Sequence, residues 1–418
     1  MQEPLPGVLE HIEQARRTAS VVKDIPADTP LLPIRRLGVI GAGTMGSGIT
    51  MNFLTAGLPV TLLDRSQDAL DKGVAMIERN YQSAVKRGKI DTAQAEAAMT
   101  NLAASVDFAD LANADLIIEA VYENMDTKKG VFAKLDKIAK PDAILASNTS
   151  NLDIDEIALA TSRPQSVLGM HFFSPAHVMK LLEVVRGKAT GKQQLATVMA
   201  LAVAVGKTPV VSGVCYGFIG NRILHARQIQ AQALIMEGAK YWDVDAALLE
   251  FGFPMGPWQM ADLAGIDLGW HRDACRIENL QDALCAAGRW GQKTGKGFYD
   301  YDENRKPKPS PEVEALIETF AQKTGKPQRE IGKQEIRERL LYPMINEAAL
   351  ILQEGIAQRA SDVDTVWLSG YGWPAWTGGP MFWAHHLGLK VIVKGLEKYS
   401  LPVAPLLAEK AEAGTPLE

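Results

Sequence analysis

The sequence predicts a doubly wound α/β domain that is followed by two copies of an all-helical domain. Short apolar runs alternate with helical patterns over residues 33–213, which is typical of a parallel sheet covered by helices. The strand signal fades after Gly217, and a helical segment then recurs at a constant offset. The length of 418 residues suits three domains of about 150 residues each.

The first 32 residues are expected to form a helix and a tether. Helical periodicity covers residues 8–19, and the segment 24–30 contains Pro26 and Pro30. Two prolines so close together prevent a helix. Residues 1–32 are therefore predicted to be a linker outside the α/β domain.

The α/β domain is expected over residues 33–213. Apolar runs predict strands at 36–40, 60–63, 116–120, 144–146, 167–169 and 209–211, the last of them at a sheet edge. Helical patterns extend to Ala56 and to about Lys86, and others cover 92–102 and 193–205. This alternation predicts a parallel, doubly wound sheet.

Two helical domains are expected beyond this point, over residues 214–304 and 312–418. The first opens with helical patterns at 219–238 and 244–251. Residues 305–311 between the two domains are charged and rich in proline. We therefore expect a linker there.

An internal repeat supports this division. Arg222 and Arg339 stand 117 positions apart, and so do Gly238 and Gly355. The match continues with small insertions through DVD at 243–245 and 362–364, FGFP at 251–254 and YGWP at 371–374, and GP at 256–257 and 379–380. A duplicated helical domain accounts for this pattern better than two unrelated helical segments.

Composition and charge exclude several classes of protein. Lys and Arg number 44 against 49 Asp and Glu, a net charge of −5; this argues against a broad nucleic-acid-binding surface but allows a local basic pocket. Cys215, Cys275 and Cys285 are too few and too irregular for a disulfide framework or a zinc site, so we expect reduced thiols and no metal.

We also expect no targeting signal or membrane helix from the sequence. No apolar stretch approaches the roughly 20 residues of a membrane helix. Neither a secretory signal nor a C-terminal peroxisomal tripeptide is apparent. We therefore expect a soluble, cytoplasmic protein without a membrane span.

A glycine-rich turn follows the first predicted strand of the α/β domain. Gly41, Gly43 and Gly46 have the spacing of the dinucleotide fingerprint, and Thr44 and Met45 complete the turn. The amides of the helix that follows can hold phosphates. The sequence therefore predicts a Rossmann-type domain that binds a dinucleotide through these five residues.

Asp64, at the end of the next strand, bears on the choice of dinucleotide. A carboxylate there accepts hydrogen bonds from the adenine ribose and repels a 2′-phosphate. This favours NAD over NADP. Arg65 beside it leaves a second interpretation open, because an arginine can pair with a phosphate or lie over the adenine.

His171 is the candidate base for a reaction with a bound nicotinamide. It follows the strand-like run 167–169, where the carboxyl end of a sheet opens towards ligands. Glu183, twelve residues later, is placed where it could hold the imidazole in one tautomer for general acid–base chemistry. Spacing alone also allows a purely structural histidine.

Several motifs together resemble the L-3-hydroxyacyl-CoA dehydrogenases of fatty-acid β-oxidation, over about residues 33–303. They are LASNTS at 145–150, HFFSP at 171–175, MKLLEVV at 179–185, GFIGNR at 217–222 and GQKTGKGFY at 291–299. With its repeat and its N-terminal linker, the chain resembles the dehydrogenase part of a multifunctional β-oxidation enzyme, without the hydratase domain.

The resemblance implies roles for individual residues. His171 would accept the proton of the 3-hydroxyl group, and Glu183 would orient the imidazole. Ser150 and Asn221 would hold the oxygens of the substrate. Ser150 could instead merely cap the helix that follows it.

The resemblance also implies residues that hold the cofactor and coenzyme A. Glu123, Lys128 and Asn148 match positions near the cofactor, although Lys128 could instead be a solvated helix lysine. Lys86 and Arg87 match the region that contacts the nucleotide of coenzyme A, and a solvated helix end explains them equally well.

The implied function is NAD-dependent oxidation of a (3S)-3-hydroxyacyl-CoA to a 3-oxoacyl-CoA. Alternatives are a dehydrogenase restricted to 3-hydroxybutyryl-CoA or to a free hydroxy acid, and an NAD-binding structural protein without activity. Acyl chain length, and association with a thiolase or a hydratase, stay open.

The second helical copy is expected to be catalytically silent. It has Glu338 where the first has Asn221, and it lacks the preceding Gly-Phe-Ile-Gly. Single-function members of the family dimerise through their one helical domain. We therefore expect residues 312–418 to stand in for a partner subunit, which gives a monomer with an internal pseudo-dimer.

Overall fold

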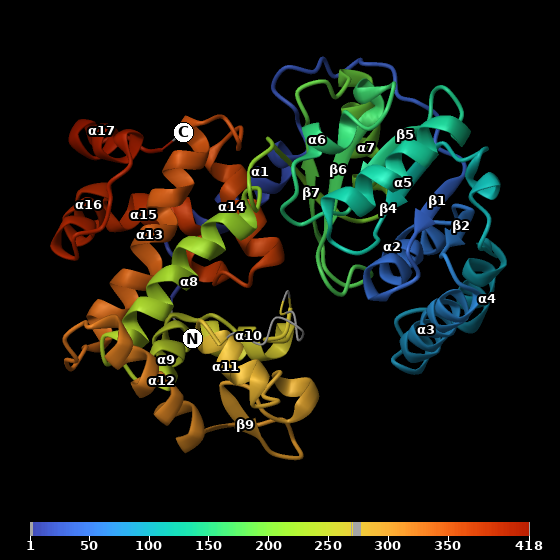
Figure 1. Ribbon diagram of the computed structural model, residues 1–418. Helices are drawn as coiled ribbons and strands as arrows, with labels where there is room; N and C mark the ends of the chain where they lie inside the picture. Colours follow the sequence, from blue (N-terminus) through green and yellow to red (C-terminus); the bar gives the residue numbers. More distant parts are fainter. Residues whose placement is uncertain (1–2, 269, 271–276, 418) are drawn as a thin grey trace.

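The computed structural model describes residues 3–268, 270 and 277–417 and divides the chain into an α/β domain and a helical part (Figure 1). Cys275 lies outside the described residues. Cys215 and Cys285 are free thiols, the first half-buried and the second buried. Among the described residues, no helix is long and apolar enough to cross a bilayer.

An eight-stranded sheet forms the centre of the α/β domain, in the order β3-β2-β1-β4-β5-β6-β7-β8. The strands are β1 (Leu37–Ile40), β2 (Val60–Leu63), β3 (Leu102–Ser105), β4 (Leu116–Glu119), β5 (Ile144–Ser147), β6 (Val167–Phe172), β7 (Leu181–Val185) and β8 (Thr208–Ser212). All six predicted strands are present, and β8 lies at an edge as expected.

The sheet is parallel as expected, except at one junction. β6 and β7 pair antiparallel, and β8 runs parallel to β7. Only residues 173–180 join β6 to β7, and a parallel crossover needs a dozen or more residues. The short connection therefore forces the chain to reverse, which places His171 directly opposite Glu183.

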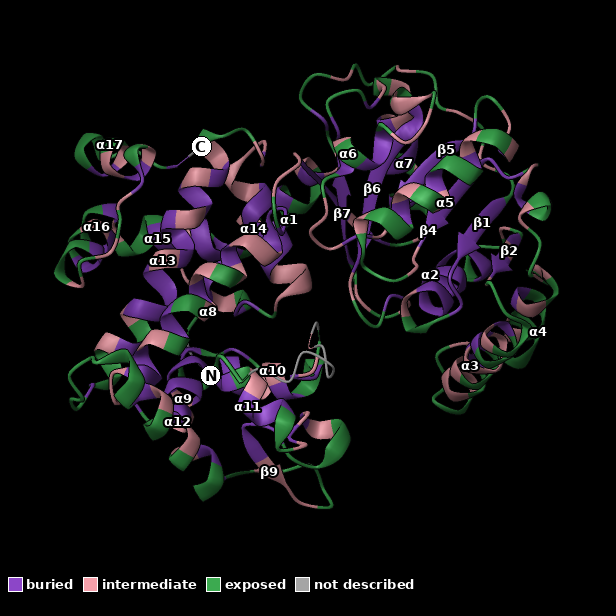
Figure 2. Cartoon of the chain, viewed as in Figure 1, coloured by how far each residue is buried: buried purple, intermediate pink, exposed green. Residues whose placement is uncertain are grey.

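Helices cover both faces of the sheet, so the domain is doubly wound. One core contains side chains from α2 (Thr44–Thr55), α3 (Gln67–Lys86), α4 (Thr92–Thr100) and α7 (Lys192–Ala204). The opposite core contains side chains from α5 (Met125–Ile138) and α6 (Ile154–Ala158). Successive strand residues alternate between the two cores, as Val39 and Ile40 do. Most residues of the strands other than β3 are accordingly buried (Figure 2).

The N-terminal helix α1 (Val8–Ala19) has the predicted bounds. It packs against α14 (Ala360–Gly370) of the helical part and against β8. His11 of α1 contacts the buried Asp364 at 2.8 Å. The tether after α1 is also attached to the α/β domain, because Arg186 donates two hydrogen bonds to Asp24. The linker helix is thus packed between the two parts of the molecule.

The helical part contains ten α-helices among the described residues. They are α8 (Gly220–Met236), α9 (Tyr241–Phe251), α10 (Pro257–Ala264), α11 (Leu280–Ala286), α12 (Pro311–Thr324), α13 (Lys333–Gln353), α14, α15 (Pro380–Leu387), α16 (Leu389–Lys398) and α17 (Pro405–Ala413). In the order of the repeat, α8, α9 and α10 correspond to α13, α14 and α15.

The predicted linker at 305–311 is more ordered than its composition suggests. Residues Pro307–Pro309 form β10, which pairs antiparallel with β9 (Tyr299–Tyr301). This hairpin returns the chain to the first copy, so that α12 packs against α8 and α11. We expected α12 to open the second copy; it instead packs with the first, and the repeated unit begins again at α13.

Buried aspartates explain why both copies make the same turn. Asp245 accepts a hydrogen bond from the backbone N–H of Trp258, and Asp364 accepts one from that of Met381. A Cβ on Gly256 would come within 2.2 Å of Asp245, and one on Gly379 within 2.4 Å of Asp364. Each Gly-Pro pair of the repeat is therefore held against its own aspartate.

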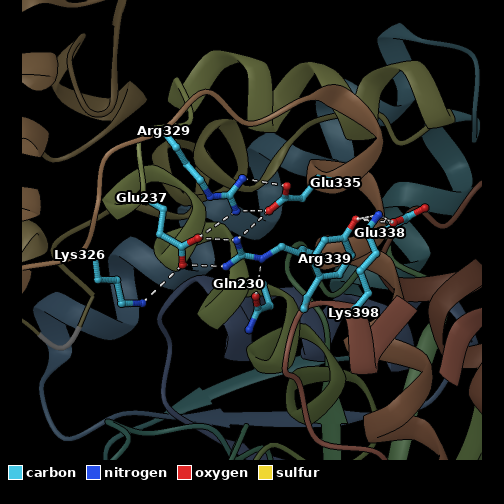
Figure 3. A network of polar contacts seen from close by, with 9 residues as sticks. Gln230, Glu237, Lys326, Arg329, Glu335, Glu338, Arg339 and Lys398 are labelled. Atoms are coloured by element: carbon cyan, nitrogen blue, oxygen red, sulfur yellow. Dashed lines mark hydrogen bonds and ion pairs between the residues drawn. The ribbon is translucent and has the colours of Figure 1, made fainter. Parts of the chain in front are cut away.

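The two copies pack on each other through α8 and α13, which lie side by side (Figure 1). Arg339 on α13 donates two hydrogen bonds to Glu237 and one to Gln230 of α8, at 2.6, 3.0 and 3.1 Å (Figure 3). Arg329 and Lys326 also reach Glu237, each at 3.5 Å. One arginine thus ties the second copy to the end of the first copy's longest helix.

Candidate active site between the α/β and helical domains

His171 and Glu183 form a buried pair at the centre of the candidate site. Nδ1 of His171 lies 2.8 Å from Oε2 of Glu183, and the two side chains are 7% and 0% exposed. The antiparallel register of β6 and β7 sets this distance. Because an ionised carboxylate only accepts hydrogen bonds, Nδ1 is the donor of this pair, and in the neutral imidazole Nε2 has the free lone pair.

Glu183 is itself held by the first helix of the helical part. Its Oε1 accepts hydrogen bonds from the backbone N–H groups of Ile219 and Gly220, at 3.2 and 3.0 Å. These donors lie at the N-terminus of α8, where the helix dipole favours a negative charge. Phe218, at a φ of 51°, makes the turn that aims them. The carboxylate therefore joins the α/β domain to the helical part electrostatically.

Ser150 links the histidine side of the site to Glu123. The backbone N–H and the hydroxyl of Ser150 donate to Oε1 of Glu123 at 2.8 and 3.2 Å. The carbonyl of Ser150 lies 3.4 Å from Nδ2 of Asn221. Ser150 does not cap the following helix, because Asp153 accepts hydrogen bonds from the first amides of α6. The alternative interpretation of Ser150 is thus wrong.

Burial disfavours the charge on Glu123, but hydrogen bonds from Thr149 and Ser150 and the charge of Lys128 outweigh it. The pKa of Glu123 therefore lies below its ordinary value. Lys128 is 1% exposed and lies 2.8 Å from Glu119 and 3.2 Å from Glu123. Lys128 is therefore not a solvated helix lysine, and its ammonium group forms an ion pair with Glu123.

Glu119 is a site residue that the sequence reasoning missed. Its side chain is fully buried at the end of β4, and it accepts hydrogen bonds from Lys128 and Ser147. The available signal was an acidic residue closing the apolar run Leu116–Glu119. A carboxylate in such a place requires a buried partner, and Lys128 supplies it.

The glycine turn has the shape that a pyrophosphate requires. Gly41 has a φ of 101°, and a Cβ there would come within 2.6 Å of the Ala120 carbonyl. A Cβ on Gly46 would come within 1.7 Å of the Gly41 carbonyl, whereas nothing lies within 4 Å of one on Gly43. Gly43 therefore leaves open space at the N-terminus of α2, and the residues present fit the diphosphate of NAD.

Thr44 is exposed and Met45 half-buried in the first turn of α2. Asp64 accepts a hydrogen bond from the Ala42 N–H at 2.8 Å, which places its carboxylate against the turn. Asn148 accepts one from the Phe172 N–H at 2.9 Å, next to His171. These residues thus lie at the carboxyl ends of the strands, with Asp64 after β2 on one side of the turn and Asn148 after β5 on the side of His171.

Lys86 and Arg87, at the end of α3, lie in different surroundings. Lys86 lines a cavity of about 400 Å³ between α3 and α4. Burial lowers the pKa of His177, and the charges of Lys207, Arg87 and Lys89 lower it further, so Arg87 belongs to a basic group near the segment after β6. Their contact with coenzyme A stays a prediction.

Tyr371 is a second residue that the sequence reasoning missed. Its hydroxyl donates a hydrogen bond to Oδ1 of Asn221 at 2.8 Å. Tyr371 follows α14, in the copy that was expected to be silent. Among the described residues, no cluster of His, Cys, Asp and Glu has the geometry of a metal site.

Comparisons with known proteins agree with this geometry. Residues 36–215 match the model of the "3-hydroxyacyl-CoA dehydrogenase, NAD binding domain". Residues 217–301 and 336–413 match the model of the corresponding C-terminal domain. The chain belongs to the 3-hydroxyacyl-CoA dehydrogenase family. It is therefore an NAD-dependent oxidoreductase, and the two C-terminal matches agree with the predicted duplication.

Curated relatives that match the chain are longer than it is. It is 42% identical over 389 residues to the peroxisomal bifunctional enzyme of Homo sapiens, covering 88% of the chain and 54% of the relative. It is 35% identical over 413 residues to a peroxisomal fatty acid beta-oxidation multifunctional protein of Oryza sativa subsp. japonica, covering 95% and 57%. The chain thus spans about half the length of the curated relatives it matches.

Solved structures of dehydrogenases share the whole arrangement. 3-Hydroxybutyryl-CoA dehydrogenase from Escherichia coli is 29% identical, with a TM-score of 0.78 over 92% of this chain and 99% of that one. The dehydrogenase part of multifunctional enzyme 1 from C. elegans is also 29% identical, with a TM-score of 0.67 over 97% of each chain. The order of an NAD-binding domain followed by a helical part is thus shared with solved dehydrogenases.

Proposed function

We propose that this protein oxidises (3S)-3-hydroxyacyl-CoA thioesters to 3-oxoacyl-CoA thioesters, in fatty-acid β-oxidation. The observation that carries the proposal is the buried His171–Glu183 pair beside Asn221 and Ser150. Bound NAD supplies the acceptor for the hydride that leaves carbon 3 of the substrate.

His171 acts as the general base. Its Nδ1 is engaged by Glu183, so Nε2 accepts the proton of the 3-hydroxyl group as the carbon–oxygen double bond forms. The imidazolium that results is stabilised by the adjacent Glu183 carboxylate. In the reverse direction the same nitrogen returns the proton to the oxygen.

Asn221 and Ser150 hold the oxygens of the substrate, and Glu123 positions the nicotinamide side of the site. Lys128 acts through Glu123, because its ammonium group is buried against two carboxylates. The fixed donors need no rearrangement when negative charge develops on the reacting oxygen.

Oxidation of NADH with acetoacetyl-CoA, followed at 340 nm, tests reaction, substrate class and cofactor together. We expect turnover with NADH and much slower turnover with NADPH, because Asp64 repels a 2′-phosphate. Parallel assays with longer 3-oxoacyl-CoAs and with free acetoacetate separate a general dehydrogenase from a short-chain or free-acid enzyme. An absence of turnover with every thioester contradicts the proposal.

We further propose that the protein is a monomer in which the second helical copy replaces a partner subunit. The packing of α8 on α13 within the chain supports this proposal. Light scattering at micromolar concentration tests it, and a tight dimer formed through these helices contradicts it. A cytoplasmic location stays a prediction beside relatives that are named peroxisomal.

A further inference from the structure

We propose that Tyr371, from the helical copy that was expected to be silent, is a positioning residue of the dehydrogenase site. Its hydroxyl fixes the side-chain amide of Asn221, so that the amide nitrogen faces the substrate side of the site. This inference rests on the proposed function, because it assigns the way in which Asn221 is oriented for that reaction.

The side-chain amide of an asparagine has an oxygen that accepts hydrogen bonds and an NH₂ group that donates them. A rotation of the amide group by about 180° exchanges their positions. Oδ1 of Asn221 accepts the Tyr371 hydroxyl at 2.8 Å, and Nδ2 lies 3.4 Å from the Ser150 carbonyl. The Ser150 carbonyl can only accept a hydrogen bond, so it faces the NH₂ group, and the Tyr371 hydroxyl then donates to the oxygen. The two contacts together hold Asn221 in the orientation that presents a donor beside Ser150.

Tyr371 is held rigidly enough to keep Asn221 in this orientation. Its ring stacks on Trp367 with centroids 4.6 Å apart and meets Phe173 edge-on at 5.4 Å. Phe173 in turn lies 4.3 Å from the His171 ring. Burial raises the pKa of Tyr371, and the charge of Glu183 raises it further. The hydroxyl thus stays protonated and remains a donor throughout the working pH range.

The first copy leaves room for this contact at Gly220. A Cβ on Gly220 would come within 2.2 Å of the Tyr371 ring and within 2.3 Å of its hydroxyl. Gly220 is also the residue whose N–H donates to Glu183. The turn that holds Glu183 is therefore shaped to admit a side chain from the second copy.

The repeat supplies an internal comparison, because the positions of Asn221 and Tyr371 correspond to Glu338 and Phe251. Glu338 and Phe251 both line one cavity of about 360 Å³. Phe251 has no hydroxyl, and Glu338 accepts hydrogen bonds from Tyr399 and Gln334 instead. Only the side of the pseudo-dimer that contains His171 has both the amide and the hydroxyl.

The substitution Tyr371→Phe removes the hydroxyl and keeps the ring that packs on Trp367 and Phe173. We expect kcat for acetoacetyl-CoA reduction to fall about ten-fold, the effect of losing one hydrogen bond that positions Asn221. The KM for NADH and the melting temperature should stay at wild-type values. Tyr399→Phe is the matched control, because it removes a hydroxyl bonded to Glu338, and it should leave kcat unchanged.

A double-mutant cycle with Asn221→Ala distinguishes positioning from packing. If Tyr371 acts through Asn221, Tyr371→Phe causes no further loss of kcat in the Asn221→Ala background. The inference is overturned if Tyr371→Phe lowers kcat equally in both backgrounds, or if the single variant has the kcat of the wild type. The proposed function stands in either case, provided that the wild-type enzyme reduces the thioester. A wild-type enzyme that fails to reduce any thioester overturns both.

Discussion

Arg222 and Arg339 make the same contacts in opposite directions across the helical part. Arg339 of α13 binds Glu237 and Gln230 of α8, and Arg222 of α8 binds Glu354 and Glu347 of the second copy. These partners stand at equivalent positions of the repeat. The contact is therefore isologous, like that of a two-fold dimer, although both surfaces belong to one chain.

The arginine of the second copy should contribute measurably to stability. Arg339 is 8% exposed, so Arg339→Met should lower the unfolding free energy by about 2 kcal/mol, the usual effect of losing buried hydrogen bonds to a charged group. All eight tryptophans lie beyond residue 240, so their fluorescence during urea denaturation reports on the helical part. Arg337→Met, an exposed change on the same helix, should change stability by less than about 0.5 kcal/mol. Equal effects of the two changes would contradict the role of Arg339.

The same interface should weaken in acid. Hydrogen bonds from Arg339 and Arg222 lower the pKa of Glu237 and of Glu354, respectively. A carboxylate with a lowered folded-state pKa stabilises the fold above its unfolded pKa of about 4.5, and this contribution is lost as the pH falls below that value. The stability difference between wild type and Glu237→Gln should therefore shrink between about pH 6 and about pH 3. Urea denaturation at a series of pH values measures it, and a constant difference would be inconsistent with this linkage.

Replacement of the proposed base should separate chemistry from cofactor binding. His171→Gln should lower kcat by roughly 10²–10⁴-fold, the usual contribution of general acid–base catalysis. NADH affinity, measured by fluorescence titration, should be unchanged because the glycine turn is intact. Near-full turnover in this variant would falsify the assignment of His171.

The glycines of the turn should have different roles. Gly43→Ala places a Cβ where nothing lies within 4 Å, so the melting temperature should stay unchanged while NADH binding weakens because the methyl group meets the pyrophosphate. Gly46→Ala places a Cβ within 1.7 Å of the Gly41 carbonyl, so the domain itself should be destabilised. Melting curves and NADH titrations of both variants test this difference. If both variants had the same melting temperature and the same NADH affinity, the two glycines would not have different roles.

Local patterns predicted most of the α/β domain. The six expected strands are apolar runs, and strands that are buried on both faces can be recognised in a sequence as such runs. β3 was missed because Leu102–Ser105 contains small residues that are only partly buried and continue a helical pattern. β7 was missed as a strand because its residues were interpreted only as a motif around Glu183, although all five are buried.

The parts of the site that the sequence could not reveal depend on contacts between distant segments. Tyr371 lies 150 positions from Asn221, and its own surroundings contain only a turn after a helix. Glu119 and Lys128 are nine positions apart, yet only the buried end of β4 makes them partners. Spacing identifies side chains that share an element, whereas these pairs arise from packing between elements.

The union of Asn221 and Tyr371 in a single polypeptide has a consequence for behaviour in dilute solution. Two surfaces joined in one chain meet at an effective concentration that does not vary with the amount of protein. Turnover per molecule should accordingly be the same at nanomolar and micromolar enzyme. The two halves of one chain can also differ, and here an amide and a phenol on one side stand at the positions of a carboxylate and a phenyl ring on the other.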